Sequence, residues 1–321
     1  MAKGLYVSEL ADNLPVESTF LVSSKSQGQT KSGSEYLLVR LVDRTGEIEG
    51  RIWNRADELG SRFERNDFVL IRGSGTLYQG KLQLKINDLI KREPRDVSLE
   101  DYLPMTNKDP SAMLEELKDI LRRMENPYLK SLAEAFFADE TLMEKFSEAP
   151  AGKTIHHPYI GGLLEHTLSL LKLILKVVEN YEGIDVDLLI VGGFLHDFGK
   201  VKEFRWDQLV EYTDEGQLVG HLVMELELVA DKIREIPHFP DELAMLVKHL
   251  LVSHHGAYEF GSPKLPQTLE AMILHYLDDL DGKINSIQGL LERERRARSR
   301  WSSFHRAYNR AFFRTREEPI R

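Results

Sequence analysis

Residues 186–200 read VDLLIVGGFLHDFGK, and this stretch indicates the fold of the larger part of the chain. Its apolar residues recur at spacings of three and four, which predicts a buried helix running into the polar pair His196-Asp197. A His-Asp pair arises by chance often enough to be weak evidence alone. Burying an imidazole and a carboxylate without partners is costly, however, so the pair needs partners from elsewhere in the chain.

Six further segments show the same helical spacing of apolar residues. They cover residues 113–124, 128–138, 161–181, 220–236, 241–256 and 268–296. From Ser111 onward the pattern is helical, with no internal repeat and no low-complexity tract. The sequence therefore predicts an all-helical domain here.

Histidines and aspartates lie within or at the ends of these predicted helices. His166 stands in LLEHTL, His221 in VGHLV, His254 and His255 in SHHG, and Asp278 in HYLDDLDGK. A lone histidine in an apolar helix is more often a hydrogen-bonded core residue than a ligand. The order H…HD…H…HH…D is different, because burying so many polar groups becomes favourable once they converge on metal ions.

Residues 16–92 read as β-structure. Five segments combine alternation with β-branched and aromatic residues, at 16–24, 35–43, 47–54, 67–78 and 81–90. A short helix is expected at 55–63, between the third and fourth strands, which is where an OB-fold carries its helix. We therefore predict a small Greek-key barrel of the OB type, with an SH3-like barrel or a sandwich fragment as the alternatives.

The predicted fold class is a multidomain β plus all-α protein. An OB-fold nucleic-acid-binding domain spans 1–92, and a linker with three prolines spans 93–110. The all-helical domain with the candidate metal ligands spans 111–289, and an Arg-rich tail spans 290–321.

Composition and charge narrow the class of protein. The 321 residues are 42% hydrophobic and 29% charged, and no apolar run approaches the ~18 residues of a membrane span. The start of the chain lacks the apolar core of a secretory signal. The absence of cysteine excludes disulfides and thiolate sites and fits a cytoplasmic protein. Residues 96–289 carry 17 Lys and Arg against 35 Asp and Glu, whereas residues 290–321 carry 10 Arg against four Glu. An acidic body with a basic tail does not fit a protein that simply coats DNA.

The order His166, His196-Asp197, Asp278 resembles the HD superfamily of metal-dependent phosphohydrolases. Four local strings carry the resemblance further: IHHPYIGGLLEHT (155–167), FLHDFGK (194–200), SHHGAYEFGSPKLPQTLEA (253–271) and LHYLDDLDGK (274–283). These strings follow a predicted β-barrel in the sequence. In this order they resemble the bacterial YhaM-type 3′→5′ exoribonucleases, which join an OB-fold to an HD domain. The resemblance covers nearly the whole chain except the Arg-rich tail.

The resemblance implies a two-metal centre. The ligands of the first ion would be His166, His196, Asp197 and Asp278. Those of the second ion would be His221, His254 and His255, with Asp197 bridging both ions.

The resemblance also assigns supporting roles. Lys200 matches a lysine that faces the phosphate, so Asp197 and Lys200 are the expected catalytic residues. His275 matches no ligand of the family, and we expect it to support the ligands, as we do Asp279 and Asp281. We expect His156 and His157 to support the ligands or to contact substrate.

Histidine-rich sites with mixed nitrogen and oxygen donors suit transition metals better than Mg²⁺. We expect two divalent ions, Mn²⁺ in the first place, with Fe²⁺, Co²⁺, Ni²⁺ or Zn²⁺ as alternatives. Two ions bridged by a carboxylate can activate water and neutralise the charge that develops on a phosphodiester.

The barrel offers rings and arginines for single-stranded nucleic acid. Alternation along the second and third strands places Tyr36 and Arg40 opposite the inward-facing apolar residues, and does the same for Arg51 and Trp53. The alternative is that the rings belong to the barrel core and the arginines to a solvated surface.

These observations favour a metal-dependent 3′→5′ exoribonuclease acting on single-stranded RNA, with DNA left open as a substrate. The first alternative is a phosphohydrolase of small nucleotides or cyclic dinucleotides with a regulatory barrel. The Gly-Tyr-Pro element of cyclic-dinucleotide enzymes is missing, because the chain reads HHGAYEFGSPKLP there. The second alternative is a non-catalytic nucleic-acid-binding protein. The sequence leaves homo-oligomer formation open.

Overall fold

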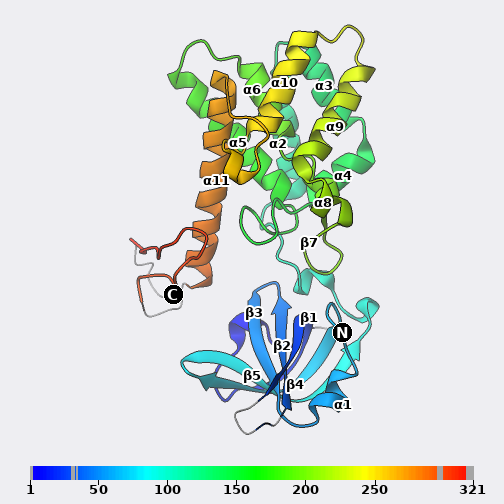
Figure 1. Cartoon of the computed structure of the whole chain (residues 1–321), viewed down its shortest axis with the longest axis vertical. Helices are drawn as coiled ribbons and strands as arrows, with labels where there is room; N and C mark the ends of the chain where they lie inside the picture. Colours follow the sequence, from blue (N-terminus) through cyan, green and yellow to red (C-terminus); the bar gives the residue numbers. More distant parts are fainter. Residues whose placement is uncertain (1–2, 30–32, 34, 295–298, 316–321) are drawn as a thin grey trace. The chain divides into compact units, whose positions relative to one another are not determined.

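The computed structural model describes residues 3–29, 33, 35–294 and 299–315, and the description that follows concerns these residues. The chain divides into two compact units (Figure 1). Residues 1–105 and 206–209 form the first unit, and residues 106–205 and 210–321 form the second.

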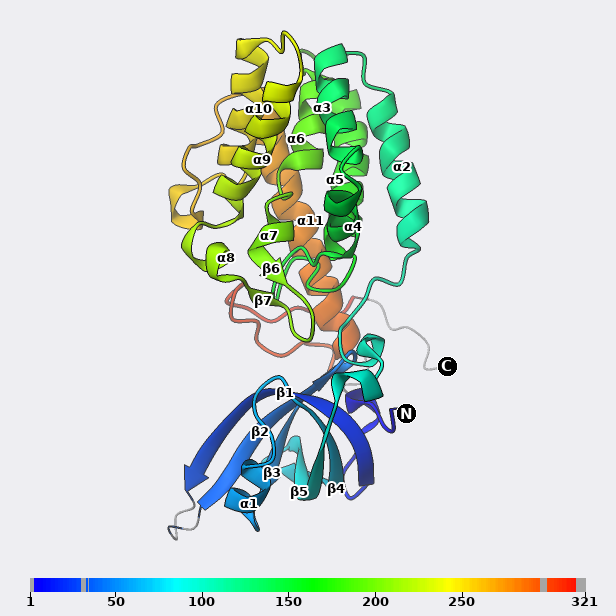
Figure 2. The ribbon, with the colours of Figure 1, turned by 90° about the vertical axis from the view of Figure 1, so that its right-hand side faces the viewer.

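The first unit is a closed five-stranded barrel (Figure 2). Its strands are β1 (Pro15–Gln29), β2 (Glu35–Asp43), β3 (Gly46–Ile52), β4 (Phe68–Tyr78) and β5 (Lys81–Arg92). The order around the barrel is β1-β2-β3-β5-β4, and antiparallel pairing of β4 with β1 closes it. The β3–β5 pairing is parallel, and helix α1 (Ala56–Gly60) lies between β3 and β4. This is the topology of an OB-fold and not of an SH3-like barrel or a sandwich.

Alternation along the strands builds the barrel core. Leu37, Val39 and Leu41 on β2 are buried together with Ile52 at the end of β3. Strand β1 runs five residues beyond the predicted segment, through the polar stretch Lys25–Gln29. This extension pairs with β2 as a ribbon, so backbone hydrogen bonding defines it and no apolar pattern marks it.

The predicted linker 93–110 contains short 3₁₀ turns at Pro94–Asp96 and Leu99–Asp101, where the sequence indicated no regular structure. The side chains of Tyr102 and Leu103 are buried, and the Tyr102 ring lies 4.7 Å from that of Phe68, centroid to centroid. The boundary between the two units falls after Met105, inside this segment.

The second unit is helical. Its helices are α2 (Pro110–Arg122), α3 (Pro127–Phe137), α4 (Glu140–Glu148), α5 (Gly162–Val177), α6 (Val186–Leu195), α7 (Lys200–Glu203), α8 (Asp214–Leu218), α9 (His221–Glu235), α10 (Asp241–Ser253) and α11 (Leu269–Arg293). Short 3₁₀ turns lie at Val178–Asn180 and Tyr258–Phe260, and the strands β6 (Phe204–Arg205) and β7 (Glu211–Tyr212) form a small ribbon. None of the described helices is both long and apolar enough to cross a membrane.

Helix α6 is the centre of this unit, because every residue from Leu188 to Leu195 is buried. It packs against α3, α5, α10 and α11. Gly192 and Gly193 allow this close approach, since a methyl group on them would press on Leu250 of α10 and on Ile174 of α5. The sequence predicted this helix but extended it to Lys200, whereas it ends at Leu195 and the chain turns through His196-Asp197.

Helices α4 and α8 and the β6–β7 ribbon have no counterpart in the sequence prediction. They are short, so few apolar positions mark their period. The predicted Arg-rich tail lies partly outside the described residues, at 295–298 and 316–321. Its described part contains isolated bridges between Trp301 and Phe313 and between His305 and Arg310.

Candidate metal centre

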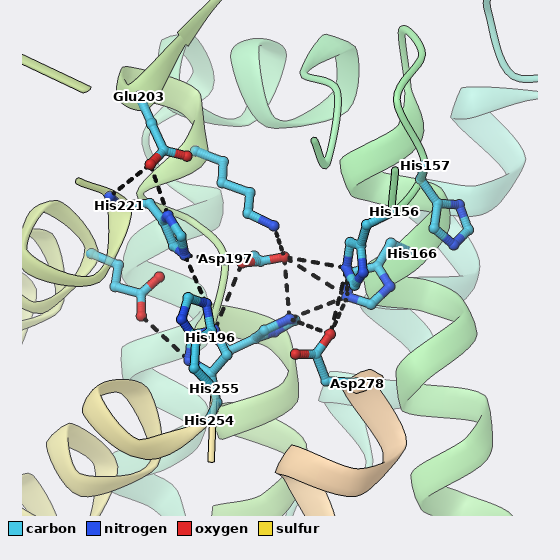
Figure 3. A network of polar contacts seen from close by, with 12 residues as sticks. His156, His157, His166, His196, Asp197, Glu203, His221, His254, His255 and Asp278 are labelled. Atoms are coloured by element: carbon cyan, nitrogen blue, oxygen red, sulfur yellow. Dashed lines mark hydrogen bonds and ion pairs between the residues drawn. The ribbon is translucent and has the colours of Figure 1, made fainter. Parts of the chain in front are cut away.

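Five helix segments bring the predicted ligands to one place in the second unit (Figure 3). His166 lies on α5, and the pair His196-Asp197 lies in the turn that follows α6. The others lie at the start of α9, just after α10 and on α11: His221, His254, His255 and Asp278.

Four side-chain atoms form what we term the first donor group: Nε2 of His166, Nε2 of His196, Oδ2 of Asp197 and Oδ1 of Asp278. Nε2 of His166 lies 3.2 Å from Nε2 of His196 and 3.2 Å from Oδ1 of Asp278. Nε2 of His196 lies 3.3 Å from Oδ2 of Asp197. Ligands bound at right angles to one ion at ~2.1 Å are ~3.0 Å apart, so these separations suit a common ion.

The second donor group consists of Nε2 of His221, His254 and His255 together with Oδ1 of Asp197. Nε2 of His221 and Nε2 of His255 are 3.2 Å apart. Oδ1 of Asp197 lies 3.8 Å from Nε2 of His221 and 3.9 Å from Nε2 of His254. Asp197 therefore turns one oxygen to each group, as a bridging carboxylate would (Figure 3).

Gly199 explains how His221 comes so near to Asp197. A Cβ on Gly199 would overlap the carbonyl oxygen of His221, so only glycine lets the start of α9 meet this turn. Gly199 lies in the short turn between α6 and α7, and His221 is the first residue of α9.

Within the two donor groups, Nε2 of His254 and Oδ1 of Asp278 are buried and have no hydrogen-bond partner among the described residues. A buried acceptor without a partner is unfavourable, and one cation at each donor group would satisfy these two atoms. Burial lowers the pKa of His254, so its ring is neutral and presents a lone pair. The residues present therefore fit divalent metal ions.

The other ring nitrogen of each histidine is anchored. Nδ1 of His196, His254 and His255 donates to the carbonyl oxygen of Gly193, Leu251 and Phe260, over 3.0, 2.7 and 2.9 Å respectively. Nδ1 of His166 donates to Asp281 over 2.8 Å, and Nδ1 of His221 to Glu203 over 2.9 Å. These bonds fix the tautomer in which Nε2 is free to bind a metal.

The charges of the site compensate one another. Burial alone would raise the pKa of Asp197 and Asp278, but Lys200 and His196 hold that of Asp197 well below its usual range. His166 and His196 do the same for the pKa of Asp278. Burial alone would lower the pKa of His196, yet the carboxylates of Asp197 and Asp278 raise it to about 10. Both carboxylates are thus ionised, and a divalent cation can take the place of the proton.

Lys200 lies beside the bridging carboxylate. Its Nζ atom donates to Oδ2 of Asp197 over 2.7 Å, and the side chain is buried. Burial alone would lower the pKa of Lys200, but Asp197 raises it, so the ammonium is charged. The position is compatible with the predicted role at the phosphate.

The three histidines that were expected to play supporting roles occupy different places. Nε2 of His156 lies 3.1 Å from Nε2 of His166, at the first donor group itself. His157 bonds to Asp281 through Nε2 over 2.9 Å. His275 donates from Nδ1 to the carbonyl oxygen of His254 over 2.8 Å, which supports the chain at the second donor group.

Two carboxylates of the site escaped the sequence reasoning. Glu203 holds both Nδ1 and the backbone N–H of His221, and no motif marks it. Glu225 is fully buried 3.8 Å from Nδ1 of His254, and burial raises its pKa well above the usual range. Only its spacing could have indicated Glu225 from the sequence, because it lies four residues after His221 and therefore on the same face of α9.

Three aromatic rings surround one arginine on the barrel. The rings of Tyr36 and Trp53 lie 4.7 Å apart, and the Arg51 guanidinium lies 5.5–5.7 Å from the rings of Tyr36, Trp53 and Tyr78. Trp53 and Tyr78 are exposed, so they are not core residues. Arg40 pairs with Glu47 over 2.7 Å and lies outside this cluster, whereas Arg51 pairs with Glu49 over 2.8 Å and lies within it. The structure thus gathers three of the four predicted contact residues and adds Tyr78.

Comparisons with known proteins match both units. The HD domain family matches residues 163–283, and the OB-fold nucleic acid binding domain family matches residues 21–91. The 3′-5′ exoribonuclease YhaM of Bacillus velezensis is 33% identical over 297 residues, which cover 91% of this chain and 92% of that protein. Proteins of the same name from Bacillus subtilis and Geobacillus sp. are 32% and 34% identical, over 91% of this chain and 92% and 89% of their own lengths.

Proposed function

This chain belongs to the family of YhaM 3′→5′ exoribonucleases, and on that premise we propose that it cleaves single-stranded RNA at a two-ion centre bridged by Asp197. It is a metal-dependent hydrolase that shortens RNA from the 3′ end. The number and identity of the ions and the residues that hold them are the new parts of the proposal.

One observation carries the two-ion proposal: the two oxygens of Asp197 face two different sets of histidine nitrogens. The first donor group supplies two imidazoles, the second supplies three, and Asp197 stands between them. When bound, two divalent ions activate a water and neutralise the charge that develops on the phosphate oxygens.

The chain's own residues prepare this site in advance. Asp281 accepts from Nδ1 of His166, and Glu203 accepts from Nδ1 of His221. These bonds orient the two imidazoles before the ions bind, so the rings do not reorganise on binding. Lys200 places a charged ammonium at Asp197, where it can attract the phosphate of the terminal nucleotide. Asp197 holds the two donor groups at a set separation.

The donor set favours a first-row transition metal over Mg²⁺, and Mn²⁺ is the ion that we propose. Five imidazole nitrogens and two carboxylates form a mixed set that suits first-row transition metals, whereas Mg²⁺ prefers oxygen ligands and retained waters. Fe²⁺, Co²⁺, Ni²⁺ and Zn²⁺ share the preference for imidazole and are the competitors to be tested.

The barrel supports binding of the single-stranded substrate. The exposed rings of Trp53 and Tyr78 and the half-buried ring of Tyr36 lie around Arg51. Stacking surfaces beside a positive charge are the combination on which single-stranded nucleic acids bind. Stacking does not depend on sequence, which suits an enzyme that degrades many RNAs.

The test uses 5′-labelled single-stranded RNA with Mn²⁺, a chelator control and a matched DNA strand. We expect stepwise shortening from the 3′ end that stops when the metal is removed, and protection when the RNA is circularised. Cleavage of circular RNA, or of mononucleotides and cyclic dinucleotides alone, would reject the exonuclease assignment. Comparing the RNA with the DNA strand measures whether the enzyme distinguishes ribose from deoxyribose.

A further inference from the structure

We infer that His156 is a fifth ligand of the first donor group, beside His166, His196, Asp197 and Asp278. The inference rests on the metal site of the proposed function and adds to it a residue from a different segment. His156 lies in the loop between α4 and α5, ten residues before His166.

The distances place Nε2 of His156 within the group. It lies 3.1 Å from Nε2 of His166, 3.4 Å from Oδ1 of Asp278 and 3.9 Å from Oδ2 of Asp197. Ligands at right angles around one ion are ~3.0 Å apart and opposite ligands ~4.2 Å, given bonds of ~2.1 Å. All three separations fall near or between these values, so His156 occupies one more corner of the same coordination shell.

One hydrogen bond between two histidines does not account for the whole arrangement. Nδ1 of His166 is turned to Asp281, so Nε2 is the ring nitrogen that faces the group. It faces Nε2 of both His156 and His196, at 3.1 and 3.2 Å. Three nitrogens and a carboxylate oxygen turned toward a common point form a cation site.

The backbone of the loop is held in a conformation that few residues adopt. His156 and His157 have φ of 67° and 52°, in the left-handed region that disfavours a β-carbon. Such residues persist only where their surroundings over-determine them, and they concentrate at functional sites. The loop is therefore built to point these two side chains in set directions.

One face of α11 provides that support. Oδ1 of Asn285 accepts from the backbone N–H of His157 over 3.0 Å, and Asp281 binds the ring of His157. Gly282 leaves room for His156, because a Cβ there would overlap its Nδ1 atom. Glycine weakens a helix interior, and the His156 ring gives a reason for its presence. Together with Asp278, these positions are spaced i, i+3, i+4 and i+7, which is a single helix face.

The decisive variant is His156→Gly, because glycine keeps the left-handed backbone and removes only the imidazole. We expect the affinity of the first site for Mn²⁺ to fall about tenfold or more, measured by competition with a chelating dye and by metal content after desalting. The visible spectrum of the Co²⁺-loaded protein should change, and added imidazole should restore affinity and spectrum. His238→Gly, at an exposed turn histidine with a φ of 59° that belongs to neither donor group, is the matched control and should behave as wild type.

A second variant keeps His156 and displaces its ring. Gly282→Ala improves the intrinsic helix propensity of α11 while its methyl group takes the space of Nδ1, so metal affinity should fall in a protein that still folds. Gly289→Ala, two turns further along α11, is the control with the same chemical change and should bind metal normally.

The outcomes separate the inference from the proposed function. Wild-type affinity and an unchanged Co²⁺ spectrum in both His156→Gly and Gly282→Ala would overturn the inference, and lost RNA cleavage with intact metal binding would make His156 a substrate contact. A wild-type protein that holds no ion at all would instead overturn the proposed metal site.

Discussion

Oδ2 of Asp281 lies 2.8 Å from Nδ1 of His166, which places a carboxylate directly behind an imidazole of the first donor group. The same oxygen lies 2.9 Å from Nε2 of His157, and Oδ1 accepts from the Ser169 hydroxyl over 2.5 Å. His157 and His166 hold the pKa of Asp281 far below its usual range although burial would raise it, so the carboxylate is ionised. One side chain thus orients a ligand and holds the loop that carries His156.

Asp281→Asn tests this double role. The amide keeps the shape but loses the negative charge, and its NH2 group replaces one of the two acceptor oxygens, so either the two histidines or Ser169 lose their acceptor. We expect the Mn²⁺ affinity of the first site to fall by about 10- to 100-fold, measured by competition titration. Asp279→Asn is the matched control, because Asp279 lies half-buried on the same helix and pairs with Lys283, away from both donor groups. Equal affinities in the two variants would contradict the role of Asp281.

Asp197→Ala tests the bridge. Because each oxygen of Asp197 faces one donor group, its loss should reduce the metal content from about two ions per chain to less than one. His166→Ala and His254→Ala should each give an intermediate content, since each belongs to one group. Elemental analysis after desalting measures all three. A wild-type content of one ion, with full activity in His254→Ala, would leave a one-metal site made by the first donor group.

Metal removal should destabilise the helical unit. An ion that binds only the folded state stabilises it by about 2.7 kcal/mol when its concentration is 100 times Kd. For a domain of this size, that energy corresponds to a shift of roughly 5–10 °C in the Tm. We therefore expect a chelator to lower the Tm in differential scanning calorimetry, and Asp197→Ala to show little response to Mn²⁺. The idea fails if both proteins respond alike.

Trp53→Ala should weaken binding of single-stranded RNA. Loss of one stacking ring is worth about 1–3 kcal/mol, which corresponds to a Kd raised by about 5- to 150-fold in fluorescence anisotropy. Hydrolysis of a small chromogenic phosphodiester should stay unchanged, because it needs the metal centre and not the barrel. Arg40→Ala is the comparison, since Arg40 pairs with Glu47 and stands outside the ring cluster. If Arg40→Ala weakens RNA binding as much as Trp53→Ala, general charge and not stacking governs affinity.

The sequence alone determined much of this protein. Alternating residues predicted the barrel strands, and the three- and four-residue spacing predicted the long helices, because both patterns follow from local geometry. The order of His166, His196-Asp197 and Asp278 indicated a metal site, because so many buried polar groups need a common partner. The polar end of β1 was not predictable, since only its pairing with β2 makes it a strand.

Only the tertiary structure decided which of the remaining residues join the site. Asp281 and His166 are 115 positions apart, and Glu203 and His221 are 18 apart, so no local period relates them. His156 had no helical pattern to place it, and its position depends on the space that Gly282 leaves on α11. A sequence pattern reports which face of its own helix a residue lies on. Which side chains meet across different helices depends on how the whole core packs, and packing at near-crystalline density allows few alternatives.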